Sequence, residues 1–301
     1  MIGIILLNYC NYELTVDCIE SIKKSTQKNI KIYVIDNASP DQSGSKLKKI
    51  KNICFIQSDM NLGFAGGNNI GIKKALDDGC EYVMLLNNDT VISNDMIEKL
   101  VKKASHNTVT VPKMYYFDVN GEKDVIWYAG GWIKYKSADG LHIGGGKKDS
   151  EEFNKEELVS FATGCCMLIH KDILKQVGML REEYFMYCED TDYSIRLQKE
   201  GIGILYVPQA KLWHKVSASS GGEMSKFIVY YIVRNKIYCA IKNKLGIKTY
   251  LYIVAETLYR TLKAYMGKYY CNYVIAPRAL IAGVMKKMGR EEKIGSIPKF
   301  V

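Results

Sequence analysis

Short apolar runs alternate with amphipathic stretches through the first third of the chain. The apolar runs are continuous, as in strands buried on both faces, and they lie at residues 2–8, 31–36, 52–57 and 81–88. Between and after them, apolar side chains recur at helical spacing at residues 14–22, 67–78 and 93–104, with Ser93 as the N-cap of the last helix. This order predicts an α/β fold, a Rossmann-like and mainly parallel sheet with helices on both faces.

Polar side chains follow three of the predicted strands at their carboxyl ends. They are Asn8 and Tyr9, then Asp36, and finally Asn87, Asn88 and Asp89. Because ligands bind outside the carboxyl ends of strands in open parallel sheets, we expect these side chains to share one crevice. Residues 61–69 form a Gly-rich segment after the third strand. Its glycines allow close backbone approach, and the helix that follows can face an anion with its N-terminus.

A second acidic cluster contains Glu189, Asp190 and Asp192. A carboxylate that takes the proton of an attacking hydroxyl typically accelerates a transfer reaction by ~10²–10⁴. We choose Asp190 as this catalytic base, with Glu189 and Asp192 as its acidic neighbours. The alternative is that Asp190 or Asp192 caps the helix that carries Ile195 and Leu197.

Trp213 and His214 follow a further apolar run at residues 202–207. Oxygen ligands such as Asp89 suit Mg²⁺ or Mn²⁺, and an added imidazole from His214 favours Mn²⁺. A lone histidine is more often structural, and Trp213 is more often a packing residue than a platform for an acceptor. Glycine-rich residues 128–132 and 144–148 cover a donor or line an acceptor groove, unless they are plain turns.

Composition narrows the class of protein. The 301 residues are 48% hydrophobic and 25% charged, as in a globular protein, and no apolar run is long enough to span a membrane. The N-terminal run lacks the basic region and cleavage site of a signal peptide. The nine cysteines are odd in number and contain no CxxC pair, so we expect reduced thiols in a cytoplasmic protein.

The positive charge of the chain is concentrated in its last quarter. Residues 227–301 contain 14 Lys and Arg against 3 Asp and Glu, a net charge of +11, and ten of the 22 tyrosines. We predict a basic, Tyr-rich helical tail that contacts an anionic membrane face as a peripheral protein. The alternative is a helical cap that packs on the main domain or mediates a homodimer.

Several ordered motifs resemble those of the family 2 inverting glycosyltransferases, in the branch of the bacterial rhamnosyltransferases. The motifs are residues 8–9, 34–41, 61–71, 86–90 and 184–192, and a tail segment at residues 230–235. The resemblance implies a GT-A fold, with residues 1–226 as the transferase domain and 227–301 as the tail. Within that domain, residues 1–110 are the nucleotide-binding half and 111–226 the acceptor half. It also implies a nucleotide-diphosphate sugar donor, a divalent cation (Mn²⁺ or Mg²⁺), and a glycan or lipid-linked glycan acceptor.

The resemblance also assigns roles to positions that match the family motifs. Asp36 resembles the base-recognition aspartate, Asn88 stands where the ribose or phosphate is approached, and Asp89 matches the last acid of the DXD metal motif. Asn87 replaces an acid of that motif, which weakens the site for a cation. The full set of donor contacts implied is Asn8, Tyr9, Asp36, Asn61, Gly63, Gly67, Asn68 and Asn88. The metal ligands are Asp89, His214 and Asn87, and the acceptor contacts are Thr163, Gly164 and Trp213.

The branch points to dTDP-rhamnose as the donor, with a UDP-linked galactose, N-acetylglucosamine or galactofuranose as the alternative. A sugar-phosphate nucleotidylyltransferase would need a Gly-rich basic loop after the first strand, and residues 8–12 are instead Asn-Tyr-Cys-Asn-Tyr. A non-catalytic membrane- or nucleic-acid-binding module would explain the basic tail. It is disfavoured because residues 1–226 are slightly acidic and contain no motif that reads RNA or DNA. We therefore expect a cytoplasmic glycosyltransferase that acts on cell-surface polysaccharide, at the inner face of the plasma membrane where the tail docks.

Overall fold

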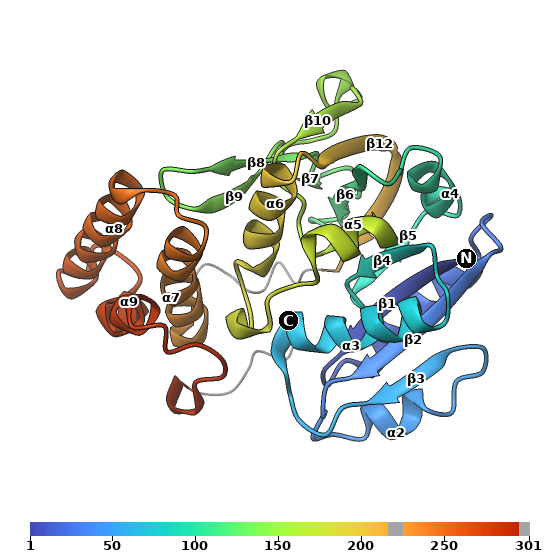
Figure 1. Ribbon diagram of the computed structural model, residues 1–301, viewed down its shortest axis with the longest axis horizontal. Coiled ribbons are helices and arrows are strands. Elements are labelled where there is room, and N and C mark those ends of the chain that lie inside the picture. The colour runs from blue at the N-terminus through green and yellow to red at the C-terminus, as the bar shows by residue number, and fades with distance from the viewer. Residues whose placement is uncertain (216–224, 295–301) are drawn as a thin grey trace.

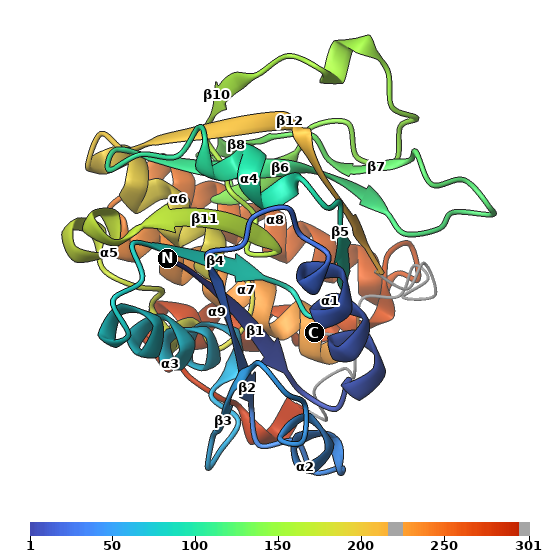
Figure 2. The same cartoon turned by 90° about the vertical axis from the view of Figure 1, so that its right-hand side faces the viewer.

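A computed structural model describes residues 1–215 and 225–294, and its centre is a ten-stranded mixed sheet (Figures 1 and 2). The order along the main path is β10-β12-β6-β11-β4-β1-β2-β3, with β5 paired to β12 and β7 paired to β6. A separate two-stranded hairpin, β8 and β9, extends toward the C-terminal helices (Figure 1). The sheet therefore joins an N-terminal half and a second half through the β4–β11 pair.

The N-terminal half is parallel, as predicted. Its strands are β1 (Ile2–Asn8), β2 (Ile30–Asp36), β3 (Cys54–Gln57) and β4 (Tyr82–Leu86). Its helices are α1 (Tyr12–Lys23), α2 (Ser43–Leu47) and α3 (Gly63–Asp77). Asn8 pairs in register with Asp36, so the two polar strand ends lie side by side at one edge of the sheet.

The second half is mixed, because β11 inserts antiparallel between β4 and β6. The elements of this half are β5 (Thr90–Ile92), α4 (Met96–Val101), β6 (Thr108–Tyr116), β7 (Ile126–Tyr128), β8 (Gly131–Lys134), β9 (Asp139–His142), η1 (Glu151–Phe153), β10 (Glu157–Val159), β11 (Cys166–His170), α5 (Lys171–Val177), η2 (Glu182–Tyr184), α6 (Glu189–Lys199) and β12 (Gly203–His214). The prediction of a mainly parallel sheet thus holds for the N-terminal half, and the second half departs from it.

Several predicted elements have different bounds in the structure; helix α3, for example, begins at Gly63 rather than at residue 67. The run at residues 81–88 is not one strand, because β4 ends at Leu86 and a turn at residues 87–89 leads into β5. Strand β12 extends to His214, which is its last residue and pairs with Thr90. Helix α4 begins two residues later than predicted, since its N-cap is Asp95 rather than Ser93. Ser93 instead donates a hydrogen bond to the Asp95 carboxylate.

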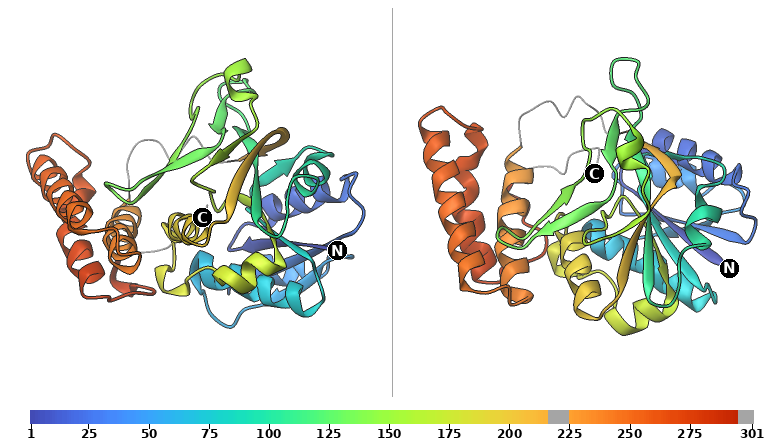
Figure 3. Two further views of the ribbon diagram at one scale, coloured as in Figure 1. Left: turned by 45° about the horizontal axis from the view of Figure 1, so that its top comes forward. Right: turned by 90° about the horizontal axis from the view of Figure 1, so that it is seen from above.

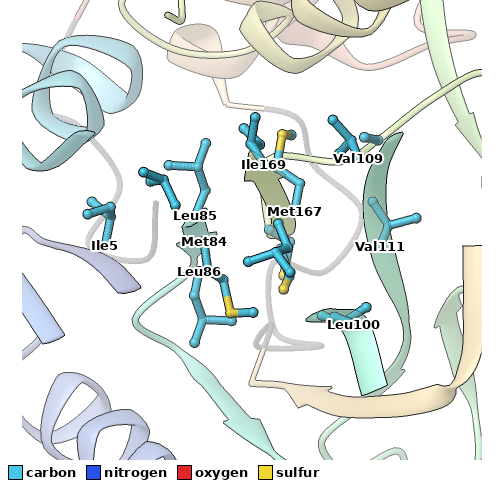
Figure 4. Packing of buried hydrophobic residues seen from close by; sticks show 14 of the residues in the cluster. Ile5, Met84, Leu85, Leu86, Leu100, Val109, Val111, Met167 and Ile169 are labelled. Carbon is cyan, nitrogen blue, oxygen red and sulfur yellow. The ribbon is translucent and has the colours of Figure 1, made fainter. Parts of the chain in front are cut away.

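The main hydrophobic core lies between the sheet and its helices. Burying such side chains stabilises the fold by about 1.5–3 kcal/mol for each large aliphatic group. Figure 4 labels part of this core, where strands from both halves of the sheet meet: Ile5, Met84, Leu85, Leu86, Leu100, Val109, Val111, Met167 and Ile169. The nine cysteines are all free thiols, and five of them are buried, as the prediction of reduced thiols requires.

The C-terminal segment is helical, as predicted, through its described part to residue 294; residues 295–301 of the predicted tail lie outside the described range. It consists of α7 (Lys226–Lys242), α8 (Ile247–Tyr265), η3 (Cys271–Ile275), α9 (Ala276–Val284) and η4 (Glu292–Ile294). Helix α7 lies between α6 and the outer pair α8 and α9 (Figures 1 and 3). Tyr238 and Cys239 of α7 belong to the main core, so this helix is integrated with the rest of the fold. Among the described residues, no helix is both long and apolar enough to cross a membrane.

Candidate active site

Two cavities open at the carboxyl edge of the parallel strands. The larger, of about 340 Å³, extends from the end of β4 toward α6, β9 and α7, and its lining includes both Glu189 and Asp190. The smaller, of about 190 Å³, includes Asn68, Asn88 and Asp89 in its lining. Four residues line both cavities and form the junction between them: Phe64, Asn87, Trp127 and His214. We call the larger the acceptor-side cavity and the smaller the donor-side cavity.

Asp89 and His214 meet at the junction. The turn after β4 presents Asp89, and the end of β12 presents His214, so the pairing of β12 with β5 brings them together. His214 Nε2 lies 3.0 Å from Asp89 Oδ1. The two atoms do not form a hydrogen bond, and Asp89 Oδ1 and His214 Nδ1 are buried without a hydrogen-bond partner among the described residues.

This arrangement fits two ligands of one cation. Ligands at right angles around Mg²⁺, each about 2.1 Å from it, are about 3 Å apart, and an unpartnered carboxylate oxygen beside an imidazole supplies two such atoms. Within residues 1–215 and 225–294, no group of three or more His, Cys, Asp or Glu side chains is placed to hold a metal. A cation held by this pair would therefore need further ligands, such as the oxygens of a bound diphosphate, to complete its coordination shell.

Asn87 and Asn88 occupy the same turn. The main-chain N–H of Asn87 donates a hydrogen bond to the carbonyl of Cys165, and the main-chain carbonyl of Asn87 accepts one from Thr90 Oγ1. The main chain of the turn is therefore held from both sides. The Asn87 side chain lines both cavities, next to Asp89. Asn88 is buried, and its amide donates to Thr15 Oγ1 at 2.8 Å. Sequence analysis had placed both residues at this position.

Asp36 is fully enclosed at the end of β2, with 1% of its surface exposed. Its Oδ1 accepts hydrogen bonds from Asn8 Nδ2 at 2.6 Å and from Ser39 Oγ at 2.7 Å. Its Oδ2 accepts from the Ser39 amide and from Gln57 Nε2. Asn8 is equally engaged, because its Oδ1 accepts from Thr15 Oγ1. A nucleobase N–H would have to replace one of these donors to reach the Asp36 carboxylate.

The Gly-rich segment forms the turn into α3 and the first turns of that helix. Gly63 has φ +71°, and a Cβ there would lie 2.0 Å from the carbonyl oxygen of Phe185. A Cβ at Gly67 would lie 2.4 Å from Leu7 Cδ1 on β1. Gly63 is therefore required by a main-chain contact, whereas a side chain at position 67 would require Leu7 to move. Asn61 shapes the turn before α3, since its Oδ1 accepts from the Gly63 amide at 2.8 Å.

Four predicted donor contacts in this region line hollows at the strand ends. Asn68, on the first turns of α3, lines the donor-side cavity while its amide donates to the Phe64 carbonyl at 2.9 Å. Tyr9, Asn61 and Gly63 line a small hollow of about 10 Å³ at the ends of β1 and β2. The predicted donor-contact residues thus divide between the donor-side cavity, this hollow and buried supporting positions.

Glu189 and Asp190 open helix α6 and both line the acceptor-side cavity. Asp190 Oδ2 accepts a hydrogen bond from the Gly164 amide at 3.1 Å, and Oδ1 accepts from the Thr191 amide at 2.7 Å. Glu189 Oε2 is buried and has no hydrogen-bond partner within residues 1–215 and 225–294. The N-cap is Cys188, in the left-handed region, so neither Asp190 nor Asp192 is the capping residue.

The two neighbouring carboxyl groups have different electrostatic surroundings. Burial raises the pKa of Asp190, and the hydrogen bonds from Gly164 and Thr191 offset part of this rise. Burial, followed by the charge of Asp190, raises the pKa of Glu189 to about 8. Adjacent groups whose environments push their pKa values apart take different protonation states. Within the pair, Asp190 is the better-stabilised anion because it accepts the Gly164 and Thr191 amides, and Glu189 is the group that more readily holds a proton.

Asp192 lies on the other side of α6 and is completely buried. Its carboxylate accepts hydrogen bonds from Arg181, Tyr184 and Asn243 on Oδ1, and from Arg196 on Oδ2 at 2.9 Å. Its side chain does not line either cavity. The structure thus separates Asp192 from Glu189 and Asp190, with which the sequence grouped it, and engages it in an internal ion-pair network.

The predicted acceptor residues divide in the same way. Thr163 and Gly164 line the acceptor-side cavity beside Asp190. Trp213 does not, because neighbouring residues of β12 point to opposite faces of the sheet and His214 takes the cavity side. The Trp213 indole N–H donates to the Lys123 carbonyl at 3.0 Å, and its ring stacks on Tyr115. This position is the packing alternative that the sequence left open.

Trp127 is the aromatic side chain that reaches the junction. Its ring lies 4.5 Å from the ring of His214 and 4.5 Å from that of His142, measured between centroids, edge to face in both cases. His142 Nδ1 lies 3.0 Å from the Trp127 carbonyl oxygen, and burial lowers the His142 pKa. Sequence analysis missed both residues. The only signal was the Gly-rich segment at residues 128–132, which lies between them and which it marked as part of a cover or groove.

Arg234 and Asn235 of α7 support the segment that precedes the carboxylates. Asn235 is fully buried, and its Nδ2 donates to the carbonyl oxygens of Tyr184, Met186 and Tyr187 at 3.0, 2.7 and 2.8 Å. Arg234 adds a hydrogen bond to the Tyr184 carbonyl at 2.8 Å. Sequence analysis recognised residues 230–235 as a family segment but gave them no structural role.

The Rossmann-like half-sheet and the acidic groups at its strand ends are the arrangement expected of a glycosyltransferase of the GT-A type. Comparison with known proteins agrees. The family described as Glycosyl transferase family 2 matches residues 2–178, and the chain belongs to this family. The predictions of family, fold and enzyme class are thereby confirmed.

Relatives of the chain include several enzymes of glycan synthesis. It is 26% identical to the low-salt glycan biosynthesis hexosyltransferase Agl10 of Haloferax volcanii, over 78% of this chain and 74% of that protein. It is 25% identical to the dTDP-rhamnosyl transferase RfbF of Shigella flexneri, over 66% and 64%. It is 22% identical to the N-acetylglucosaminyl-diphospho-decaprenol L-rhamnosyltransferase of Mycobacterium tuberculosis, over 73% and 78%.

Solved structures share the fold at lower identity. GalNAc-T7, crystallised with UDP, GalNAc and Mn²⁺, superposes with a TM-score of 0.62 at 14% identity, over 80% of this chain and 47% of that chain. The mannosyltransferase PcManGT from Pyrobaculum calidifontis, in complex with GDP-Man and Mn²⁺, gives a TM-score of 0.57 at 13% identity, over 99% and 76%. These likenesses confirm the GT-A fold.

Proposed function

We propose that the protein transfers rhamnose from dTDP-rhamnose, with inversion, to a hydroxyl group of a glycan or lipid-linked glycan. One observation carries the chemistry: Asp190 and the Asp89–His214 pair line two cavities that meet at shared residues. A reaction at this junction has a proton acceptor on one side and a place for the leaving diphosphate on the other. The choice of rhamnose is supported by relatives named as rhamnosyltransferases.

On the donor side, Asp89 and His214 would hold a divalent cation, with Asn87 beside them. When bound, such a cation neutralises the negative charge that gathers on the departing diphosphate. Asn88 and Asn68 line the same cavity and are the side chains best placed to contact the ribose or the phosphates. Asp36 and Asn8 hold the ends of β1 and β2 together through the 2.6 Å hydrogen bond and thereby fix the floor of this site.

On the acceptor side, Asp190 takes the proton from the attacking hydroxyl. Its charge is supported by the Gly164 and Thr191 amides, whereas Glu189 more readily holds a proton, so the pair presents one base. Base catalysis of this kind contributes roughly 10²–10⁴ to the rate. Trp127, Phe161 and Tyr187 give the cavity an aromatic wall, which suits the apolar faces of sugar rings.

A lipid-linked acceptor would bring the enzyme to a membrane surface. The basic tail, with a net charge of +11 over residues 227–301, is suited to contact with anionic lipid from the cytoplasmic side. We therefore propose a peripheral enzyme at the inner face of the plasma membrane, engaged in the synthesis of a cell-surface polysaccharide.

Calorimetry with sugar nucleotides tests the donor. The panel is dTDP-rhamnose, UDP-galactose, UDP-N-acetylglucosamine and GDP-mannose, each with Mn²⁺ and with chelator. We expect dTDP-rhamnose to bind at least about tenfold more tightly than the others, and only with the cation. Preference for a UDP-sugar would overturn rhamnose but keep the enzyme class. Binding of equal strength with and without the cation would show that Asp89 and His214 are not its ligands. NMR of the product would determine whether the transfer proceeds with inversion.

A further inference from the structure

Helix α8 exposes most of its large apolar side chains and buries three threonines. Its buried face consists of Ile253, Ala264 and the threonines at positions 249, 257 and 261, whose hydroxyl groups donate to main-chain carbonyls. Its outer face carries leucines seven and four residues apart, at positions 251, 258 and 262. A surface helix in water has the opposite arrangement, so this outer face is built for a non-aqueous contact.

The apolar face continues onto α9, which packs beside α8 at the outer side of the molecule (Figures 1 and 3). Its members are each at least half exposed: Ile247, Leu251, Leu258, Tyr259, Leu262, Tyr265 and Met266 from α8 and its end, and Ile281, Val284 and Met285 from α9 and its end. Most of the exposed large apolar side chains of the described chain lie in these two helices and the turn between them. We call this set the docking face. Contiguous apolar surface of this kind marks a contact site.

Basic side chains lie beside the docking face, and no acidic side chain of the described residues forms an ion pair with them. Lys248, Lys268, Lys286, Lys287 and Arg290 are exposed beside it. Residues 225–294 contain few acidic side chains, and most of these are paired within the protein. Glu256 pairs inside with Lys236 and Arg260, and Glu291 pairs with Arg278, which leaves Glu292 as the one exposed acid within residues 225–294.

We propose that the docking face inserts into the headgroup region of a bilayer that contains anionic phospholipid. Both components of the surface fit this partner. Burial at the acyl boundary stabilises the apolar residues, and the negative headgroups attract the flanking basic side chains. A second copy of the chain fits less well. Two docking faces in contact would oppose like charges, with no exposed acid on α8 or α9 to compensate.

The docking face is tied to the acceptor-side cavity. Lys236 of α7 bridges Asp139, on the cavity lining, and Glu256, on α8, with Nζ to carboxylate distances of 2.9 and 3.3 Å. Ile232 of the same helix also lines the cavity. Docking would therefore fix the cavity relative to the membrane, which suits a lipid-linked acceptor; this last step rests on the proposed function.

Vesicle co-sedimentation with the full chain tests the proposal. Vesicles contain either phosphatidylcholine alone or phosphatidylcholine with phosphatidylglycerol. One variant combines Leu258→Glu with Leu262→Glu, and its control is Leu158→Glu, an equally exposed leucine on β10. A second variant combines Lys286→Glu, Lys287→Glu and Arg290→Glu. Its control, with the same change in charge, reverses three exposed lysines near α2: Lys48, Lys49 and Lys51.

We expect the native chain to bind the anionic vesicles and to release them as salt rises. The leucine variant and the tail charge variant should each lose at least about tenfold in binding, while both controls bind as the native chain does. Donor affinity and transfer to a soluble acceptor should stay unchanged in all of them. These two readouts report on the proposed function separately, so its failure is distinguishable from failure of docking.

Three results would overturn the proposal. One is a native chain that does not bind the vesicles that contain phosphatidylglycerol. Another is equal loss of binding in the variants and their controls, which would indicate general electrostatic attraction. The third is a dimer in analytical ultracentrifugation that the leucine variant dissociates, which would make the face a contact between copies.

Discussion

Asn235 Nδ2 lies 2.7 Å from the carbonyl oxygen of Met186, across the boundary between α7 and the segment that leads to the two carboxylates. This segment contains three residues with positive φ that are not glycine: Phe185 at 64°, Tyr187 at 67° and Cys188 at 69°. Left-handed backbone at such residues is costly and persists only where surrounding contacts impose it. The hydrogen bonds of Asn235 are those contacts, so α7 sets the direction in which α6 presents Glu189 and Asp190.

Asn235→Ala should impair turnover more than donor binding. Without its amide, the carbonyls of Tyr184, Met186 and Tyr187 lose a shared donor, and the positive-φ segment relaxes. We expect kcat to fall at least about tenfold while the dissociation constant of the sugar nucleotide changes less than about twofold. The acidic limb of the pH profile of kcat should also move, because the surroundings of Asp190 change.

A matched control separates positioning from simple loss of stability. Asn154→Ala removes the hydrogen bond of Asn154 Oδ1 to the buried Lys113, at a residue that lines neither cavity. Asn235→Ala should lose roughly 1–3 kcal/mol in the free energy of unfolding, because buried carbonyls lose a donor. Asn154→Ala should lose less, because Asn154 is exposed and Lys113 keeps its ion pair with Asp149. Equal effects of the two substitutions on kcat would contradict the positioning role of Asn235.

Asp190→Asn should retain donor affinity and lose turnover by at least ~10²-fold, since the base acts on the acceptor and not on the donor. Because burial raises the pKa of Asp190, turnover in the native enzyme should decline on acidification at a pH above the ordinary range of a carboxyl group. Calorimetry and steady-state kinetics measure the two quantities. Near-native transfer by the variant would move the base to Glu189.

Asp192→Asn provides the contrast, because it acts on stability. The substitution leaves Arg181 and Arg196 without their carboxylate partner in a buried network, and breaking such a network costs about 3–5 kcal/mol. We expect a large fall in melting temperature with nearly native turnover per folded molecule.

Asp89→Ala should abolish cation-dependent nucleotide binding while the fold survives. The carboxylate oxygen beside His214 has no hydrogen-bond partner among the described residues, so its removal breaks no internal bond of that atom. Melting curves should therefore stay within about 2 °C of the native protein in the absence of ligand, and the stabilisation by Mn²⁺ with nucleotide should disappear. An unchanged Mn²⁺-dependent affinity would remove Asp89 from the site.

Glu189→Gln should stabilise the protein, and more so at higher pH. The pKa of Glu189 is raised from 4.5 to about 8 in the folded state, so between these values the folded protein retains a proton that the unfolded chain releases. The free energy of unfolding consequently falls as pH rises through this window, and a neutral glutamine removes that dependence. We expect a gain of at least about 1 kcal/mol at pH 8, or roughly 2–4 °C in melting temperature, and little gain at pH 4.5. Parallel melting curves of the two proteins from pH 4.5 to 8 would contradict the raised pKa.

Sequence patterns were most informative where burial is complete. Strand β1 has the predicted bounds because every position from Ile2 to Leu6 is buried, which leaves a continuous apolar run. The prediction of one strand at residues 81–88 was wrong, because hydrophobicity does not reveal that the chain turns at Asn87 and begins a second short strand. Trp213 and His214 illustrate a related limit: a period of two places them on opposite faces but does not say which face holds the cavity.

Within the site, the sequence located the acidic groups but not their partners. Asp36 and Asn8 stand at predicted strand ends, yet only their pairing in register shows that each satisfies the other. Asp190 and Asp192 look alike in the chain and differ because one meets the Gly164 amide and the other meets two arginines. Such differences arise from contacts between residues far apart in sequence, which neither propensity nor periodicity encodes.

Gly63 and Phe185 join the two halves of the enzyme by main chain alone. The Phe64 amide donates to the Phe185 carbonyl at 2.6 Å, and no side chain fits at position 63 between them. Helix α3 and the loop before Asp190 thus form a closely packed seam, in which substitutions are poorly tolerated. The hairpin of β8 and β9 lies outside this seam and contributes Asp139, Gly140 and His142 to the cavity. New acceptor preferences can consequently arise by substitution in the hairpin, without disturbing the geometry between donor and base.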